Sequence, residues 1–99
     1  MVRDKVSILE LLHQDSEILR RMGVKRLALF GSVLSDQLRA ESDLDFLIEI
    51  QPKTFDAYMN VKEFLESRFG RTVDLVIVSA LKPMLRDAIC REAVDVSLQ

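Results

Sequence analysis

Two short apolar runs, each with an aspartate near its start, constrain the fold of this chain more than any other feature. Leu44–Ile50 alternates between the two faces of an extended chain, and residues 73–78 form a continuous run rich in β-branched side chains. Both patterns are typical of β-strands, and the continuous run predicts a central strand covered on both faces. Between them, an amphipathic stretch predicts a helix with Thr54 as its N-cap and Gly70 as its end.

The first third of the chain predicts one helix and one strand. Apolar side chains recur at near-helical spacing over residues 7–21, and Ser7 with Glu10 can form a capping box at the start of that helix. Residues 25–30 are short, apolar and followed by glycine, which favours a strand. A brief helix is expected after Ser32.

The last part of the chain predicts a final helix. Ser79 can cap this helix, Pro83 fits its first turn, and Leu85 and Ala88 are expected to face inward. The element order is then α-β-α-β-α-β-α. This order predicts an α/β (α+β) fold with a small mixed β-sheet and helices packed against it. We expect residues 1–99 to form a single domain.

Composition excludes several classes of protein. The 99 residues are 48% hydrophobic and 30% charged, with a net charge of −2, which argues against an extended nucleic-acid footprint. The single cysteine, Cys90, cannot form an internal disulfide, and a reducing, cytoplasmic setting fits. No signal peptide or membrane-spanning run is visible, so no membrane partner is expected.

Three aspartates lie near the starts of the two apolar runs. Asp43 and Asp45 are two positions apart, so an extended chain places both carboxylates on one face. Carboxylates held that close repel each other, and a divalent cation relieves the repulsion. With Asp74 on a neighbouring strand, the three could hold two Mg²⁺ ions about 3.5–4 Å apart, with Asp74 nearest the attacking group. The alternative is a solvated turn and two exposed strand ends.

Gly31 and Ser32 are candidates for binding phosphate beside the three aspartates. A glycine at a strand end allows the backbone to approach phosphate, and the start of a helix at Ser32 would direct N–H groups at the anion. The serine could be only a helix N-cap, a role that is compatible with phosphate binding because both use the same helix end. With Asp43 and Asp45 the dipeptide forms the pattern G-S-x10-D-x-D, which a chain of this size matches by chance about once in a thousand.

This pattern resembles the nucleotidyltransferase superfamily that includes DNA polymerase beta, and within it the minimal nucleotidyltransferase (MNT) branch. The resemblance extends along the whole chain to the segment MLRDAICREAV near its end. It implies the nucleotidyltransferase fold. It also implies that Gly31 and Ser32 bind nucleotide phosphates, and that Asp43, Asp45 and Asp74 bind two Mg²⁺ ions and perform catalysis with ATP as the nucleotide donor.

The resemblance further implies an antitoxin of a HEPN/MNT toxin–antitoxin system, which transfers AMP to a tyrosine of a HEPN ribonuclease toxin and can form a hetero-oligomer with it. Members often carry an arginine and a glycine after the GS dipeptide, where this chain has Ser35 and Asp36. This departure favours one alternative, an antitoxin that neutralises the toxin by binding. A further alternative is nucleotidyl transfer to RNA or to a small molecule.

Overall fold

Four strands form a single mixed sheet in the computed structural model, which describes residues 5–31 and 43–98. The strand order in this part of the chain is β3-β2-β1-β4. β1 (Val24–Phe30) pairs antiparallel with β2 (Leu44–Ile50), and β2 pairs parallel with β3 (Val73–Ile77). β4 (Val94–Asp95) pairs antiparallel with β1. The small mixed sheet predicted from sequence is confirmed.

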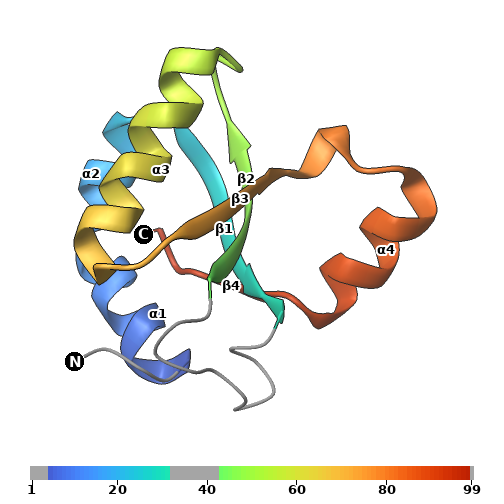
Figure 1. The fold of residues 1–99 in the computed structure, drawn as a ribbon, viewed down its shortest axis with the longest axis horizontal. Helices are drawn as coiled ribbons and strands as arrows, with labels where there is room; N and C mark the ends of the chain where they lie inside the picture. The colour runs from blue at the N-terminus through green and yellow to red at the C-terminus, as the bar shows by residue number, and fades with distance from the viewer. Residues whose placement is uncertain (1–4, 32–42, 99) are drawn as a thin grey trace.

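Helices cover the two faces of the sheet unequally, as Figure 1 shows. α1 (Lys5–Gln14), α2 (Ser16–Arg21) and α3 (Phe55–Phe69) pack on one face. α4 (Pro83–Glu92) stands on the other and contributes no fully buried residue. None of the helices in the described ranges combines the length and apolar character needed to cross a membrane.

Two hydrophobic clusters of different size result from this arrangement. The larger lies between the sheet and α1–α3, where burial of apolar side chains supplies most of the stabilisation. Its largest fully buried members are Phe46, Ile8, Leu12, Leu19, Leu27, Leu29, Leu44, Ile48 and Leu65. The smaller lies under α4 and contains Ala28, Leu47 and Val78, with Ile89 and Cys90 partly buried against them. The α4 face is therefore thinly covered, which leaves room for a site.

β2 has the bounds that its alternating pattern predicts, and it is a central strand. Phe46 and Ile48 face the larger cluster, whereas Asp45 and Leu47 face the side that carries α4. The α3 predictions are also confirmed. Thr54 Oγ1 accepts a hydrogen bond from Ala57 N at 3.1 Å, and Gly70 ends the helix in the left-handed conformation.

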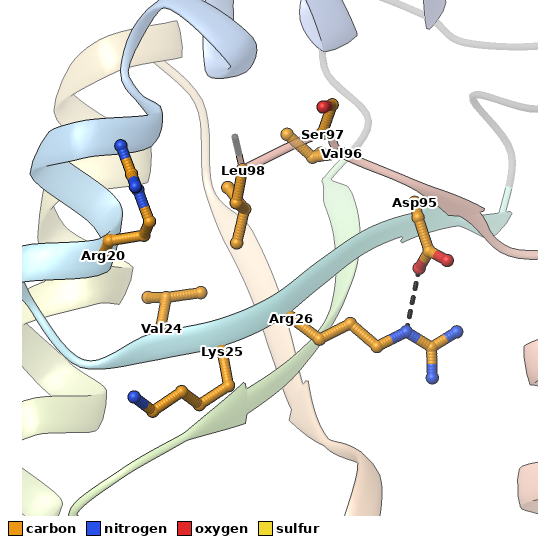
Figure 2. A pocket seen from close by; sticks show the side chains of 8 residues that line it. All are labelled: Arg20, Val24, Lys25, Arg26, Asp95, Val96, Ser97 and Leu98. Carbon is orange, nitrogen blue, oxygen red and sulfur yellow. Dashed lines mark hydrogen bonds and ion pairs between the residues drawn. The ribbon is translucent and has the colours of Figure 1, made fainter.

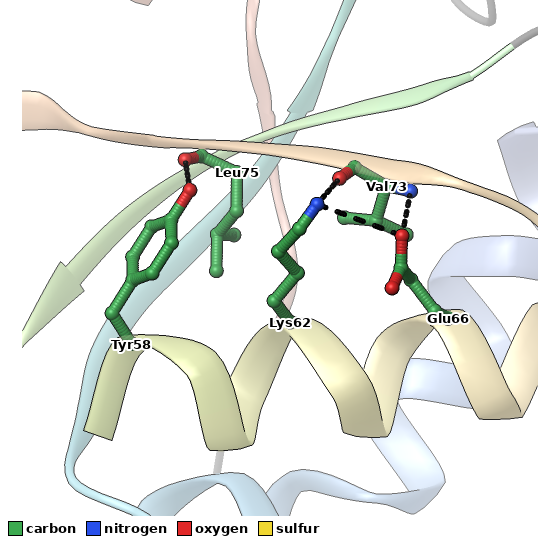
Figure 3. A network of polar contacts seen from close by, with 5 residues as sticks. All are labelled: Tyr58, Lys62, Glu66, Val73 and Leu75. Atoms are coloured by element: carbon green, nitrogen blue, oxygen red, sulfur yellow. Dashed lines mark hydrogen bonds and ion pairs between the residues drawn. The ribbon is translucent and has the colours of Figure 1, made fainter. Parts of the chain in front are cut away.

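The prediction that residues 73–78 form a central strand was wrong, because β3 lies at an edge of the sheet. Side chains of α3 cover the outer edge of β3 in place of another strand (Figure 3). Tyr58 Oη donates to Leu75 O at 2.6 Å, Lys62 Nζ donates to Val73 O at 2.9 Å, and Glu66 Oε2 accepts from Val73 N at 2.9 Å. These bonds satisfy backbone groups that an uncovered edge would leave to water.

The first helix is broken where the sequence predicted a continuous one. α1 ends at Gln14 and α2 begins at Ser16, because Asp15 turns inward and accepts hydrogen bonds from Arg68 Nε at 2.8 Å and Nη2 at 3.0 Å. The Asp15 side chain is only 8% exposed, so it needs this charged partner. Ser7 lies inside α1, so the predicted capping box was wrong as well.

The predicted start of the last helix was also misplaced. Ser79 belongs to a short 3₁₀ helix, η2 (Val78–Ala80), and Lys82 is the N-cap of α4. Pro83 occupies the first turn as predicted, but Leu85 remains 52% exposed and Ala88 is exposed too. The helix expected after Ser32 lies outside the described residues.

Candidate active site

The candidate site lies where β1 ends and where β2 and β3 begin. Asp45 of β2 is in register with Asp74 of β3 on one side and with Phe30 of β1 on the other. Paired residues on neighbouring strands direct their side chains to the same face. That face carries Leu47 and Val76 and is the one below α4. The sheet register therefore makes Asp45 and Asp74 immediate neighbours on its thinly covered face.

Gly31 follows Phe30 directly and lies against the Asp45 carboxylate. Its φ of +84° is in the left-handed region, which favours glycine. A Cβ atom at Gly31 would overlap Asp45 Oδ2 and would lie only 3.1 Å from Asp45 Cγ. The absence of a side chain at Gly31 therefore makes room for the Asp45 carboxylate. This role for Gly31 was not predicted, because spacing along the sequence does not show which side chain a glycine accommodates.

The surroundings of Asp45 shift the pKa of its carboxyl group. Burial raises the pKa of Asp45 above the ordinary value of 3.8, and the nearby charges of Asp74 and Asp43 raise this pKa further. The Asp45 side chain is half-buried, whereas Asp43 and Asp74 are exposed. The metal-free site thus concentrates negative charge around one carboxylate that is partly removed from water.

The structure brings most of the predicted site residues together. Asp43 lies just before β2, close enough for its charge to raise the pKa of Asp45, although the strand does not extend to it. Ser32, the other predicted phosphate ligand, lies outside the described residues. Glu49 shares a strand face with Asp45 but lies towards the other end of β2, and it is exposed.

The donor chemistry of these side chains suits Mg²⁺, which prefers hard oxygen ligands and is commonly held by a few carboxylates and substrate phosphates. The carboxylates are not preassembled around an ion. Among residues 5–31 and 43–98, no group of three acidic, histidine or cysteine side chains stands close enough to hold a metal. Asp43 and Asp74 are exposed, so their side chains can rotate towards an ion without disturbing the core.

Comparisons with known proteins agree on one family. The family model described as "Polymerase beta, Nucleotidyltransferase" matches residues 7–97. MJ0435 of Methanocaldococcus jannaschii, provisionally named a protein adenylyltransferase, is 35% identical over 92 residues. The match covers 92% of this chain and 99% of MJ0435.

Solved structures show the same fold. One, provisionally described as a minimal nucleotidyltransferase, has a TM-score of 0.73 and 35% identity, and the match covers 87% of this chain and 93% of that one. A chain from the complex of tri-AMPylated Shewanella oneidensis HEPN toxin with MNT antitoxin has a TM-score of 0.64 and 18% identity. That match covers 92% of this chain and 73% of that one. At such low identity, this second likeness concerns the fold alone.

Proposed function

Because this chain belongs to the polymerase beta family of nucleotidyltransferases, we propose that it is an antitoxin that transfers AMP from ATP to a tyrosine hydroxyl of a HEPN-family toxin. The observation that carries this proposal is the register of Asp45 with Asp74, beside Gly31. Two similarities support it. MJ0435 is named as an adenylyltransferase, and a chain with the same fold occurs in a complex with an AMPylated HEPN toxin.

The proposed reaction is a single displacement at phosphorus. The tyrosine oxygen attacks the α-phosphorus of ATP and forms a new P–O bond, while the bond to the oxygen that bridges to the β-phosphate breaks. Pyrophosphate leaves with that electron pair. The phenolic proton must leave the attacking oxygen, and we assign its acceptance to Asp74. Asp74 is exposed on the open face of β3, where an incoming side chain can reach it.

Each residue of the site has a defined task in this scheme. Bound by Asp43, Asp45 and Asp74, two Mg²⁺ ions would supply positive charge against the triphosphate and the reacting phosphorus. Asp45 is the least exposed of the three carboxylates, because it lies against Gly31. Gly31 makes room for the Asp45 carboxylate. The backbone of Gly31 and the hydroxyl of Ser32 are proposed to contact the phosphate.

Labelled ATP tests the reaction. With Mg²⁺ and a cognate HEPN-family protein, the chain should transfer label from the α-phosphate of ATP and none from the γ-phosphate. The Asp43→Asn, Asp45→Asn double variant should lose the transfer, by about a hundredfold or more. Glu49→Gln is the matched control, since it removes a carboxylate from the same face of β2 outside the site. Transfer by the double variant at the wild-type rate would contradict the proposal.

A second candidate is an antitoxin that neutralises the toxin by binding alone. It is favoured by Ser35 and Asp36, which stand where many MNT proteins carry an arginine and a glycine that this chain lacks. If this second function is correct, the Asp43→Asn, Asp45→Asn double variant should neutralise the toxin in cells as well as the wild type does. Loss of neutralisation by a variant that still binds the toxin would exclude occlusion as the mechanism.

A further inference from the structure

The two edges of the sheet differ in how completely they are covered. The outer edge of β3 is covered by side chains of α3. The outer edge of β1 is covered by β4 only at Ala28 and Leu29, with one further bond from Val96 N to Leu27 O at 2.8 Å. On this outer side, no further strand in the described parts of the chain pairs with the beginning of β1. Residues 24–26 therefore form an open edge.

The segment after β4 turns away from this open edge. Continued pairing would place Ser97 and Leu98 opposite residues 24–26 of β1. Instead, His13 Nδ1 of α1 donates a hydrogen bond to Ser97 O at 2.9 Å, which holds the segment towards the helices. A pocket of about 480 Å³ opens between the segment and β1 (Figure 2). The pocket therefore occupies the place that one more strand would take.

The pocket is basic, although the whole chain has a net charge of −2. Arg20, Lys25 and Arg26 line it, against the single carboxylate of Asp95. Arg26 Nε is paired with Asp95 Oδ1 at 2.8 Å, whereas none of the ion pairs found within the described residues involves Arg20 or Lys25. Arg20 Nε instead donates to the backbone oxygen of Ser16 at 3.4 Å, and Lys25 is exposed. No ion pair among the described residues therefore neutralises the charge of either side chain.

We propose that this open edge, formed by residues 24–26 of β1 and lined by Arg20 and Leu98, docks an extended acidic segment of a partner protein as an added strand. Edge strands bind such segments through backbone hydrogen bonds, and alternate side chains then supply specificity. A second copy of this chain is a poor occupant, because antiparallel pairing of two such edges would bring like charges together. The partly buried apolar side chain of Leu98 in the lining favours a peptide over a nucleic acid.

This inference is independent of the proposed catalytic function, because the pocket lies at the β1–β4 edge and Asp74 lies on β3, at the opposite edge. The probe is a short blocked peptide of alternating Glu and Val, titrated into isotope-labelled protein and followed by NMR of backbone amides. We expect saturable shifts at Lys25, Arg26 and Leu98. Lys25→Glu should weaken binding about tenfold or more, whereas Lys82→Glu, the same charge change at the exposed N-cap of α4, should bind like the wild type.

Three results would overturn the proposal. The first is the absence of saturable shifts at the open edge. The second is equal binding of a peptide of alternating Lys and Val, which would show that charge does not select the occupant. The third is that a single-stranded oligonucleotide causes the same shifts with higher affinity than the acidic peptide, which would assign the basic pocket to nucleic acid.

Discussion

Replacing Gly31 with alanine tests the most specific contact in the site. The new Cβ would overlap Asp45 Oδ2 and lie 3.1 Å from Asp45 Cγ and 3.2 Å from Asp45 Cβ. The overlapped atom is the end of a side chain with free torsions, so the Asp45 carboxylate should rotate away while the backbone stays in place. The substitution therefore displaces a carboxylate that the proposed reaction needs.

Two costs set the size of the effect on stability. An alanine at φ +84° costs about 1–2 kcal/mol in backbone strain, and an off-rotamer Asp45 costs about 0.5–1.5 kcal/mol more. Together they lower the free energy of unfolding by about 1.5–3.5 kcal/mol, or roughly 6–28 °C in Tm for a chain of this size. Displacement of a reacting group by about 1 Å should reduce AMP transfer about a hundredfold.

Gly70→Ala is the matched control for Gly31→Ala. Gly70 also has a positive φ, +62°, but nothing lies within 4 Å of its Cβ position. This variant should lose only about 1–2 kcal/mol of stability and should keep its transfer activity. Thermal unfolding by circular dichroism and transfer of label from ATP measure the two effects separately. Equal transfer by the two alanine variants, at the wild-type rate, would refute the role assigned to Gly31.

Further predictions concern the groups that the structure buries. Asp45→Asn should raise the Tm of the metal-free protein near pH 7, because the raised pKa of Asp45 means that its ionised form opposes folding. The gain should shrink as pH falls through the raised pKa and vanish below about 3.8, where the carboxyl is protonated in the folded and the unfolded states. Tyr58→Phe removes the hydrogen bond to Leu75 O and should cost about 1–2 kcal/mol in urea denaturation, and an unchanged denaturation midpoint would count against the edge-covering role. Arg68→Ala leaves Asp15 without its partner and should cost about 1–3 kcal/mol, whereas a neutral effect would show that water replaces Arg68.

Sequence patterns predicted the elements whose ends depend on residues close together in the chain. Alternation along residues 44–50 predicted the bounds of β2, and Thr54 and Gly70 predicted the ends of α3. The edge position of β3 was not predictable in this way, because a covered edge and a central position both favour apolar, β-branched residues. The contacts of Tyr58, Lys62 and Glu66 across the fold distinguish the two.

The errors at the chain's two ends also have long-range causes. The break after Gln14 depends on Arg68, which lies 53 positions after Asp15 in the sequence. β4 is two residues long and forms because it meets β1, so no periodicity marks it. The spacing between Gly31 and Asp45 predicted that the two belong to one site, but not that one makes room for the other.

A titration followed by backbone amide NMR tests the central claim most directly. The claim is that Asp45 and Asp74, brought side by side by the parallel pairing of β2 with β3, form the metal and nucleotide site beside Gly31. Addition of Mg²⁺ with a non-hydrolysable ATP analogue should shift the amide signals of these three residues together and leave Glu49 unchanged. Shifts confined to another part of the sheet, or shifts that persist in an Asp45→Asn, Asp74→Asn variant, would contradict the claim.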